Sequence, residues 1–204
     1  MWAPFIVLLF NKSLTTGCYP SVFKNAVIRP LLKKVELDDS QLKNYRPVSN
    51  LPFLFKLLER VVQNRLQCFL DSSDLMPRSQ SAYRQYHSTE TAVTKVYNDM
   101  LLAADGGQVT ALCLLDFTAA FDTVDHDMLS LERQFGIHGV ALQWFRSYLQ
   151  GRSFPVVYGG STSTMIYIVC SVPQGSVLGP RLFILYKADL ASRGEAQCEH
   201  PRVC

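Results

Sequence analysis

The sequence predicts a mixed helix and sheet domain of the α+β class, and three observations support this prediction. Its 204 residues are 48% hydrophobic and 18% charged, close to the globular average, which excludes disordered and low-complexity classes. Short β-branched runs of strand length alternate with longer segments whose apolar residues recur every three or four positions. No internal repeat and no linker-like stretch divides the chain, so we expect a single folded unit.

The first half of the chain is expected to hold one strand, one extended segment and two helices. Residues 26–32 form a β-branched run that ends at two lysines, which predicts a strand and then a loop. Residues 44–49 should be extended, because the residue before a proline avoids the helical region. Residues 53–70 predict an amphipathic helix, and a second helix should run from Ser88 to about Ala104. The polar residues assigned to the other faces of the 53–70 helix are Lys56, Glu59, Arg60, Gln63 and Arg65.

The second half begins with residues 109–115, a continuous apolar run of strand length that Asp116 follows at once. The remaining expected elements are a partly helical stretch over 121–135, a helix over 140–149, a strand pair over 154–158 and 164–170, and an apolar helix over 177–185.

Two features bear on cellular location. The apolar run at residues 5–10 is too short to span a bilayer, which needs about 20 residues; we interpret it as the buried start of a helix, with a targeting segment as the alternative. The six Cys residues contain no Cys-x-x-Cys pair and no zinc-site spacing. Cys113 and Cys170 lie in apolar runs, as buried thiols do, which favours a reducing intracellular compartment, nuclear or cytoplasmic.

The net charge of +3 conceals an asymmetry along the chain. Residues 1–97 carry 13 Lys and Arg against 7 Asp and Glu, residues 98–132 carry none against 7, and residues 133–204 carry 7 against 3. A basic chain interrupted by one acidic segment fits a nucleic-acid binder with a metal site in its middle. The alternative is chance clustering of acids on a solvated face.

Two local motifs are candidates for chemistry. Asp116 follows a predicted buried strand, where a carboxylate is held rigidly and suits magnesium; the alternative is that it caps the following helix. In the segment 171–180, a Pro-Gln-Gly turn opens a helix, which brings backbone close to a ligand. Such a turn also occurs without any function.

Five ordered blocks then resemble one family. They are Asn44-Tyr45-Arg46-Pro47-Val48-Ser49, Gln80-Ser81-Ala82-Tyr83-Arg84, His87-Ser88-Thr89-Glu90-Thr91-Ala92, the segment from Leu115 to Asp122, and the segment from Pro173 to Pro180. Together, over roughly residues 5–190, they resemble the reverse transcriptase domain of non-LTR (LINE-type) retrotransposons. The resemblance implies a right-hand polymerase with fingers over residues 1–107 and a partial palm over 108–190, followed by a divergent tail over 191–204.

The resemblance also implies roles for individual residues. Asp116 would be a catalytic, metal-binding aspartate, with the backbone of Phe117 also holding the Mg²⁺ ion. Phe121 would exclude a ribose 2′-hydroxyl, unless it is only a core residue. Asp122, Asp125 and His126, beside the metal position, are interpreted as mostly structural.

Nucleotide binding is implied for four further residues. Arg84 would hold the incoming triphosphate, and Arg46 is a weaker candidate for the same cluster or an ordinary surface ion pair. Gln174 and Gly175 would back the nucleotide and the template base. The implied partners are an RNA template, a DNA primer and dNTPs, with no membrane and no partner protein implied. Nonspecific phosphate contacts would come from Lys33, Lys34, Lys43, Arg60 and Arg65.

The sequence departs from the family pattern near its C-terminus. The family's second set of metal ligands is an Ala-Asp-Asp hairpin, and the only Asp-Asp pair here is Asp38-Asp39. Asp189 is better aligned with the segment just before that hairpin. We therefore expect a chain truncated before the hairpin that does not synthesise DNA alone, because two-metal transfer needs carboxylates from two strands.

Three alternatives remain at this stage. The first is a chain that binds RNA or an RNA–DNA hybrid through its basic fingers without catalysis, and the second is a non-functional remnant that does not fold. A small Mg²⁺-dependent hydrolase is the remote third, because no cluster of His, Asp and Glu completes a site around Asp116.

Overall fold

A computed structural model describes residues 2–76, 80–114, 129–168, 170–173 and 175–198 of the chain. Within these residues the helices are α1 (Ala3–Thr16), α2 (Phe53–Ser72), α3 (Thr89–Asp105), α4 (Leu129–Arg133), α5 (Gly139–Leu149) and α6 (Gly179–Cys198). The strands are β1 (Val27–Leu32), β2 (Tyr45–Asn50), β3 (Arg152–Phe154), β4 (Val157–Tyr158), β5 (Ser161–Thr162) and β6 (Ile166–Ile168). This mixture of helices and small sheets confirms the predicted α+β class.

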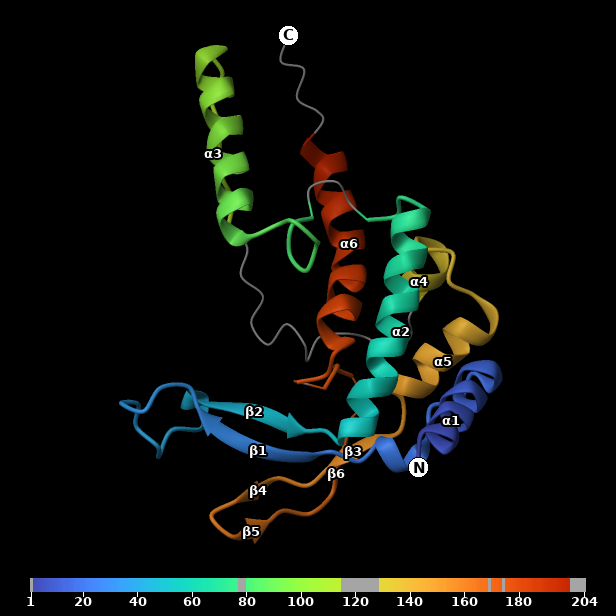
Figure 1. Ribbon diagram of the computed structural model, residues 1–204. Coiled ribbons are helices and arrows are strands. Elements are labelled where there is room, and N and C mark those ends of the chain that lie inside the picture. Colours follow the sequence, from blue (N-terminus) through green and yellow to red (C-terminus); the bar gives the residue numbers. More distant parts are fainter. Residues whose placement is uncertain (1, 77–79, 115–128, 169, 174, 199–204) are drawn as a thin grey trace.

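The strands gather at one end of the molecule (Figure 1). Figure 1 shows the strands together at one end of α2, with α5 and α6 beside that helix. α1 packs on α5, and α4 packs on α6. All three strand pairs, β1 with β2, β3 with β6 and β4 with β5, are antiparallel, so the predicted hairpin over 154–170 is confirmed as two consecutive short pairs.

β1 and β2 form a two-stranded ribbon whose register fixes which side chains share a face. Arg29 lies opposite Val48, and Leu31 lies opposite Arg46. Pro30 and Pro47 also face each other, as two prolines in the middle of a ribbon seldom do, because neither carries an N–H for the ladder. On the edge of β1 that faces away from β2, the N–H of Ile28 donates to the carbonyl of Pro155 at 3.0 Å, which joins the ribbon to the second hairpin.

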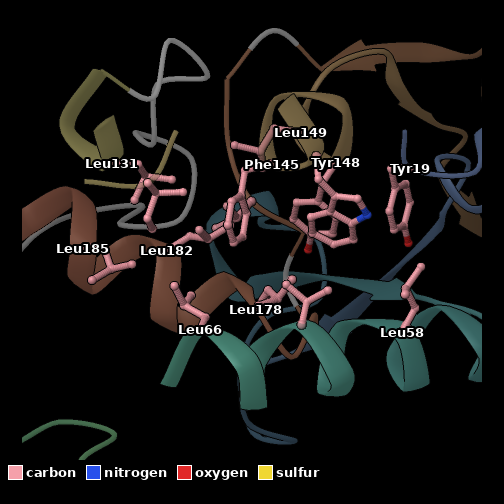
Figure 2. Close-up of a cluster of buried hydrophobic side chains, with 14 of the residues drawn as sticks. Tyr19, Leu58, Leu66, Leu131, Phe145, Tyr148, Leu149, Leu178, Leu182 and Leu185 are labelled. Atoms are coloured by element: carbon pink, nitrogen blue, oxygen red, sulfur yellow. The ribbon is translucent and has the colours of Figure 1, made fainter. Parts of the chain in front are cut away.

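The core lies where α2, α5 and α6 meet. Figure 2 shows Leu58 and Leu66 on the same side of α2, with Leu66 pointing toward Leu182 of α6 and Leu58 toward Tyr19. Leu58 and Tyr148 are fully buried, as is Leu178 just before α6. Burying one such leucine is worth about 1.5–3 kcal/mol relative to leaving it exposed. The apolar period of α2 therefore predicted its buried face well, with one exception: Glu59, assigned to a polar face, is 0% exposed.

The predicted strand over 109–115 is wrong in the part that the structure describes. Residues 109–114 form no strand, and the side chain of Val109 is 99% exposed. An apolar run becomes a strand only where a neighbouring strand offers its hydrogen bonds, and no described strand pairs with this segment.

Two burial predictions are also wrong. Cys113 and Cys170 are exposed, and neither lies inside a strand of the structure. The N-terminal run is helical, as predicted, but Phe5 and Leu8 are exposed while Phe10 is buried. Only the face of α1 that packs on α5 is covered. None of the described helices combines the length and the apolar character that crossing a membrane requires.

Candidate functional site

The structure describes only some of the residues predicted to form the site. Arg46, Arg84 and Gly175 lie among the described residues. Asp116, Phe117, Phe121, Asp122, Asp125, His126 and Gln174 lie outside them. In the described part of the chain, no three His, Cys, Asp or Glu side chains gather closely enough to hold a metal ion. The described residues therefore provide no metal site of their own.

Gly175 brings two of the sequence blocks into contact. A β-carbon added to Gly175 would lie 3.3 Å from the backbone oxygen of Ser49, and the glycine has a φ of +93°. Both the left-handed backbone and the close approach favour glycine here. The turn is closed by the N–H of Ser176, which donates to the carbonyl of Pro173 at 3.0 Å. The predicted Pro-Gln-Gly turn thus lies against the end of β2.

Arg46 lies on the same strand as Ser49 but on its other face. The register places Arg46, Leu31, Arg29 and Val48 on one face of the ribbon, because directly opposed residues share a face and alternate residues along a strand do too. All four side chains are exposed. No ion pair joins Arg46 to another described residue, and the choice between phosphate binding and an ordinary surface ion pair stays a prediction.

The opposite face of the ribbon lines a cavity of about 740 Å³. Its lining includes Ser49 and Tyr45 from β2 and Pro173 from the turn. The hydroxyl of Tyr45 donates to the carbonyl of Asp39 at 3.0 Å and lies 3.0 Å from the hydroxyl of Tyr158. This hydrogen bond with Tyr158 raises the pKa of Tyr45 to about 12. Tyr45 and Tyr158, joined by this hydrogen bond, thus both line the largely apolar cavity.

Arg84 lies away from the ribbon. It sits in the segment between α2 and α3, where its N–H donates to the carbonyl of Ser81 at 3.3 Å. Figure 1 shows this segment separated from β1 and β2. The predicted helix after it is confirmed: Ser88 caps α3, and its side chain and that of Thr91 each accept from the other's N–H. Arg46 therefore lies on β2 and Gly175 lies against β2, whereas Arg84 lies in a different part of the structure.

The predicted phosphate-binding lysines and arginines are exposed. Lys33 directly follows β1, and Lys43 lies shortly before β2. The ammonium of Lys33 donates to the carbonyl of Lys43 at 2.8 Å. Arg60 and Arg65 are exposed on α2. Their role in phosphate binding stays a prediction.

A buried polar cluster behind the turn was missed at the sequence level. Glu59 of α2 accepts a hydrogen bond from the hydroxyl of Tyr148 and another, 2.7 Å long, from the N–H of Val177. Burial raises the pKa of Glu59 to about 7. A signal was available, because Glu59 follows Phe55 by four residues and precedes Val62 by three, which places it within the apolar stripe.

Arg152 completes this cluster from β3. Its side chain is 1% exposed, and its Nε donates to the carbonyl of Tyr148 at 2.6 Å. The guanidinium carbon lies 4.4, 5.1 and 5.4 Å from the ring centres of Tyr148, Phe55 and Tyr19. Ring faces attract a cation, most strongly where water is excluded. Because Glu59 supplies the nearby carboxylate, the cluster balances a buried cation against a buried acid.

Comparison with known proteins identifies the family to which this chain belongs. The profile of the family described as reverse transcriptase (RNA-dependent DNA polymerase) matches residues 32–202, and the chain belongs to that family. More particularly, it is a reverse transcriptase domain of the non-LTR retrotransposon type, as the sequence blocks predicted.

The similar proteins come from mobile elements. The RNA-directed DNA polymerase from the mobile element jockey of Drosophila funebris is 35% identical over 191 residues, which are 93% of this chain and 20% of that protein. The probable RNA-directed DNA polymerase from transposon BS of Drosophila melanogaster is 33% identical over 202 residues, or 97% of this chain and 22% of that protein. The chain thus spans about a fifth of the length of these relatives.

Proposed function

We propose that this chain contributes to RNA-directed DNA synthesis by holding an RNA–DNA hybrid and a nucleotide against the exposed face of the β1–β2 ribbon, beside the strand end that the turn at Gly175 contacts. The observation that carries the proposal is the close approach of Gly175 to Ser49, three residues along β2 from Arg46. The exposed guanidinium of Arg46 and the point that the glycine turn contacts therefore belong to one short strand, β2. The family match and the relatives' names support the same reaction.

The exposed face of the ribbon has the chemistry that a nucleic-acid backbone requires. Arg29 and Arg46 lie diagonally across it, with Leu31 and Val48 between them. Guanidinium groups pair with phosphate oxygens in a planar, two-pronged geometry, and the two apolar side chains suit sugar and base surfaces. We assign Arg46 to phosphate binding on this face, with Arg84 as a separate contact from the segment before α3.

The reacting centre in this proposal rests on the family resemblance. Asp116 and the backbone of Phe117 would hold Mg²⁺, which when bound neutralises charge on the reacting phosphates. Phe121 would select against the ribose 2′-hydroxyl, and Gln174 would contact the nucleotide beside Gly175. Asp116 has no Asp-Asp partner later in this sequence, so we expect hybrid binding without primer extension by this chain alone.

The binding proposal is tested with a labelled RNA–DNA hybrid by fluorescence anisotropy between about 50 and 200 mM salt. We expect affinity to fall steeply with salt and Arg46→Ala to reduce the slope of log affinity against log salt by about one. Arg146→Ala, which removes an exposed arginine from α5, should leave the slope unchanged. Equal effects of the two substitutions would refute a specific role for the ribbon.

Two further measurements separate the alternatives. Primer extension with Mg²⁺ by the wild type but not by Asp116→Ala would show that the chain alone is an active polymerase. A circular dichroism melt without a cooperative transition would instead show a chain that does not fold alone, and would remove both the enzymatic and the binding proposals.

A further inference from the structure

We propose that Glu59 is a positioning residue that fixes the turn at Gly175 against β2, so that the surface offered to a nucleotide and hybrid is preformed. This inference rests on the proposed function for its ligand, but its structural part does not depend on binding. Glu59 touches neither the exposed face of the ribbon nor the turn's Gly175, and it acts through the backbone of Val177.

The contacts of Glu59 join three elements that are distant in sequence. Its Oε2 accepts the N–H of Val177 at 2.7 Å, two residues beyond Gly175, and its Oε1 accepts the hydroxyl of Tyr148 on α5. Both carboxylate oxygens are thus used, and the side chain is 0% exposed. A charged side chain is rarely buried so fully unless hydrogen bonds satisfy it.

The turn has a second fixed point just beyond this bond. The hydroxyl of Ser176 accepts the N–H of Gly179 at 2.8 Å, while the N–H of Ser176 donates to the carbonyl of Pro173. These local bonds shape the turn and its join to α6, and the Ser176 side chain also interacts with Tyr148 of α5. The bond from Val177 to Glu59 is the one that ties this segment to α2, the helix that directly follows β2.

Among the described residues, two charged groups act on the pKa of Glu59. Arg152 of β3 and Lys56 of α2 favour the charged carboxylate, as do the hydrogen bonds from Tyr148 and Val177, while burial opposes it. The same cluster acts on Tyr19 and Tyr148, whose phenol pKa values burial raises. Glutamine at position 59 would keep a carbonyl acceptor for Val177 and an N–H donor toward Tyr148, without the charge.

The test compares Glu59→Ala, Glu59→Gln and Leu58→Ala in the full chain. Leu58 is a matched control, because it is the neighbouring, fully buried residue of α2 and its loss weakens the core without removing the hydrogen bond to Val177. The first readout is amide hydrogen exchange of Val177 relative to core amides of α2, followed by NMR. The second is affinity for the RNA–DNA hybrid, measured at a temperature where every variant is folded.

We expect Glu59→Ala to speed the exchange of Val177 relative to the α2 amides by about tenfold or more and to weaken hybrid binding by a similar factor. Glu59→Gln should restore both, and Leu58→Ala should change neither. Unchanged relative exchange in Glu59→Ala, or equal loss of binding in Leu58→Ala, would overturn the proposal. If the wild type binds no hybrid, the proposed function fails, and the exchange of Val177 alone still decides whether Glu59 fixes the turn.

Discussion

The α-hydrogen side of Gly175 faces the carbonyl of Ser49 so closely that a β-carbon there would lie 3.3 Å from the oxygen. A backbone oxygen is not the flexible end of a side chain, so it cannot move aside cheaply. This contact joins two segments more than a hundred residues apart in the sequence, and it sets the geometry on which the proposed binding surface depends.

We predict that Gly175→Ala weakens both stability and hybrid binding. Its φ of +93° already disfavours alanine, and the contact with Ser49 adds to the cost, giving a loss of about 1–3 kcal/mol in the free energy of unfolding. Urea denaturation and anisotropy measure the two effects.

Gly160→Ala is the matched control for this substitution. Gly160 has a similar φ of +81°, but nothing lies within 4 Å of its added β-carbon. It should lose only the backbone contribution and keep wild-type affinity. If both variants lose affinity equally, the Ser49 contact has no part in binding.

The free energy of unfolding should depend on pH through Glu59. Its pKa is raised from 4.5 to about 7 in the folded protein, so between these values the folded state binds more protons than the unfolded state. Stability from this group is therefore fully present below about pH 4.5 and is lost as the pH rises through 7, by about 3 kcal/mol in all. Urea denaturation from about pH 5 to 8 measures the change.

Glu59→Gln tests this assignment directly, because glutamine does not titrate in this window. We expect its free energy of unfolding to vary far less with pH than that of the wild type. A wild-type curve that instead rises between pH 5 and 8 would contradict the raised pKa.

Tyr148→Phe should be destabilising even though the ring is preserved. It removes the hydroxyl that donates to Glu59 inside the core, which leaves a buried carboxylate oxygen without a donor and costs about 1–3 kcal/mol. Tyr158→Phe removes the hydroxyl of an exposed residue instead, and we expect a change within about 0.5 kcal/mol. Thermal or urea unfolding of the two variants decides the point, and equal losses would count against the cluster.

α3 should respond to a change at its N-cap residue without involving the core. Ser88→Ala removes the cap that accepts the N–H of Thr91, which costs about 1 kcal/mol of helix stability. Thr94→Ala, at an exposed position of the same helix, should stabilise it slightly because alanine has the higher helix propensity. Exchange of α3 amides reports both changes, while core amides should stay as they are because α3 has no buried residue among its own.

The local elements were predictable because their causes are local. The residue before Pro47 had to be extended, and β2 follows; the apolar period of residues 53–70 predicted α2 nearly to its ends. The apolar run over 109–115 failed as a predicted strand because a run of this kind states only that burial is favourable, and says nothing of which strand will pair with it.

The candidate site was predictable only in part. The Pro-Gln-Gly turn and Arg46 stood out as motif residues, but their proximity depends on how β2 and the turn pack, which no local pattern contains. A charged residue on an amphipathic helix normally faces solvent, and this general rule places Glu59 on a polar face. Its position between Phe55 and Val62 argued otherwise, and its partners Tyr148 and Arg152 lie about ninety residues away in the sequence.

The pair of prolines in the ribbon has a consequence for association between molecules. The N–H of Ile28 points away from β2 toward Pro155, and the nitrogen of Pro30, two residues along β1, points the same way. Pro47 lies directly opposite Pro30, so its nitrogen points away from β1. It therefore lies on the edge of β2 that no described strand pairs with. Neither nitrogen can donate a hydrogen bond, so a strand from another molecule that approached β2 would meet a gap in its ladder. The exposed ribbon is thereby protected against edge-to-edge aggregation while its charged face stays open.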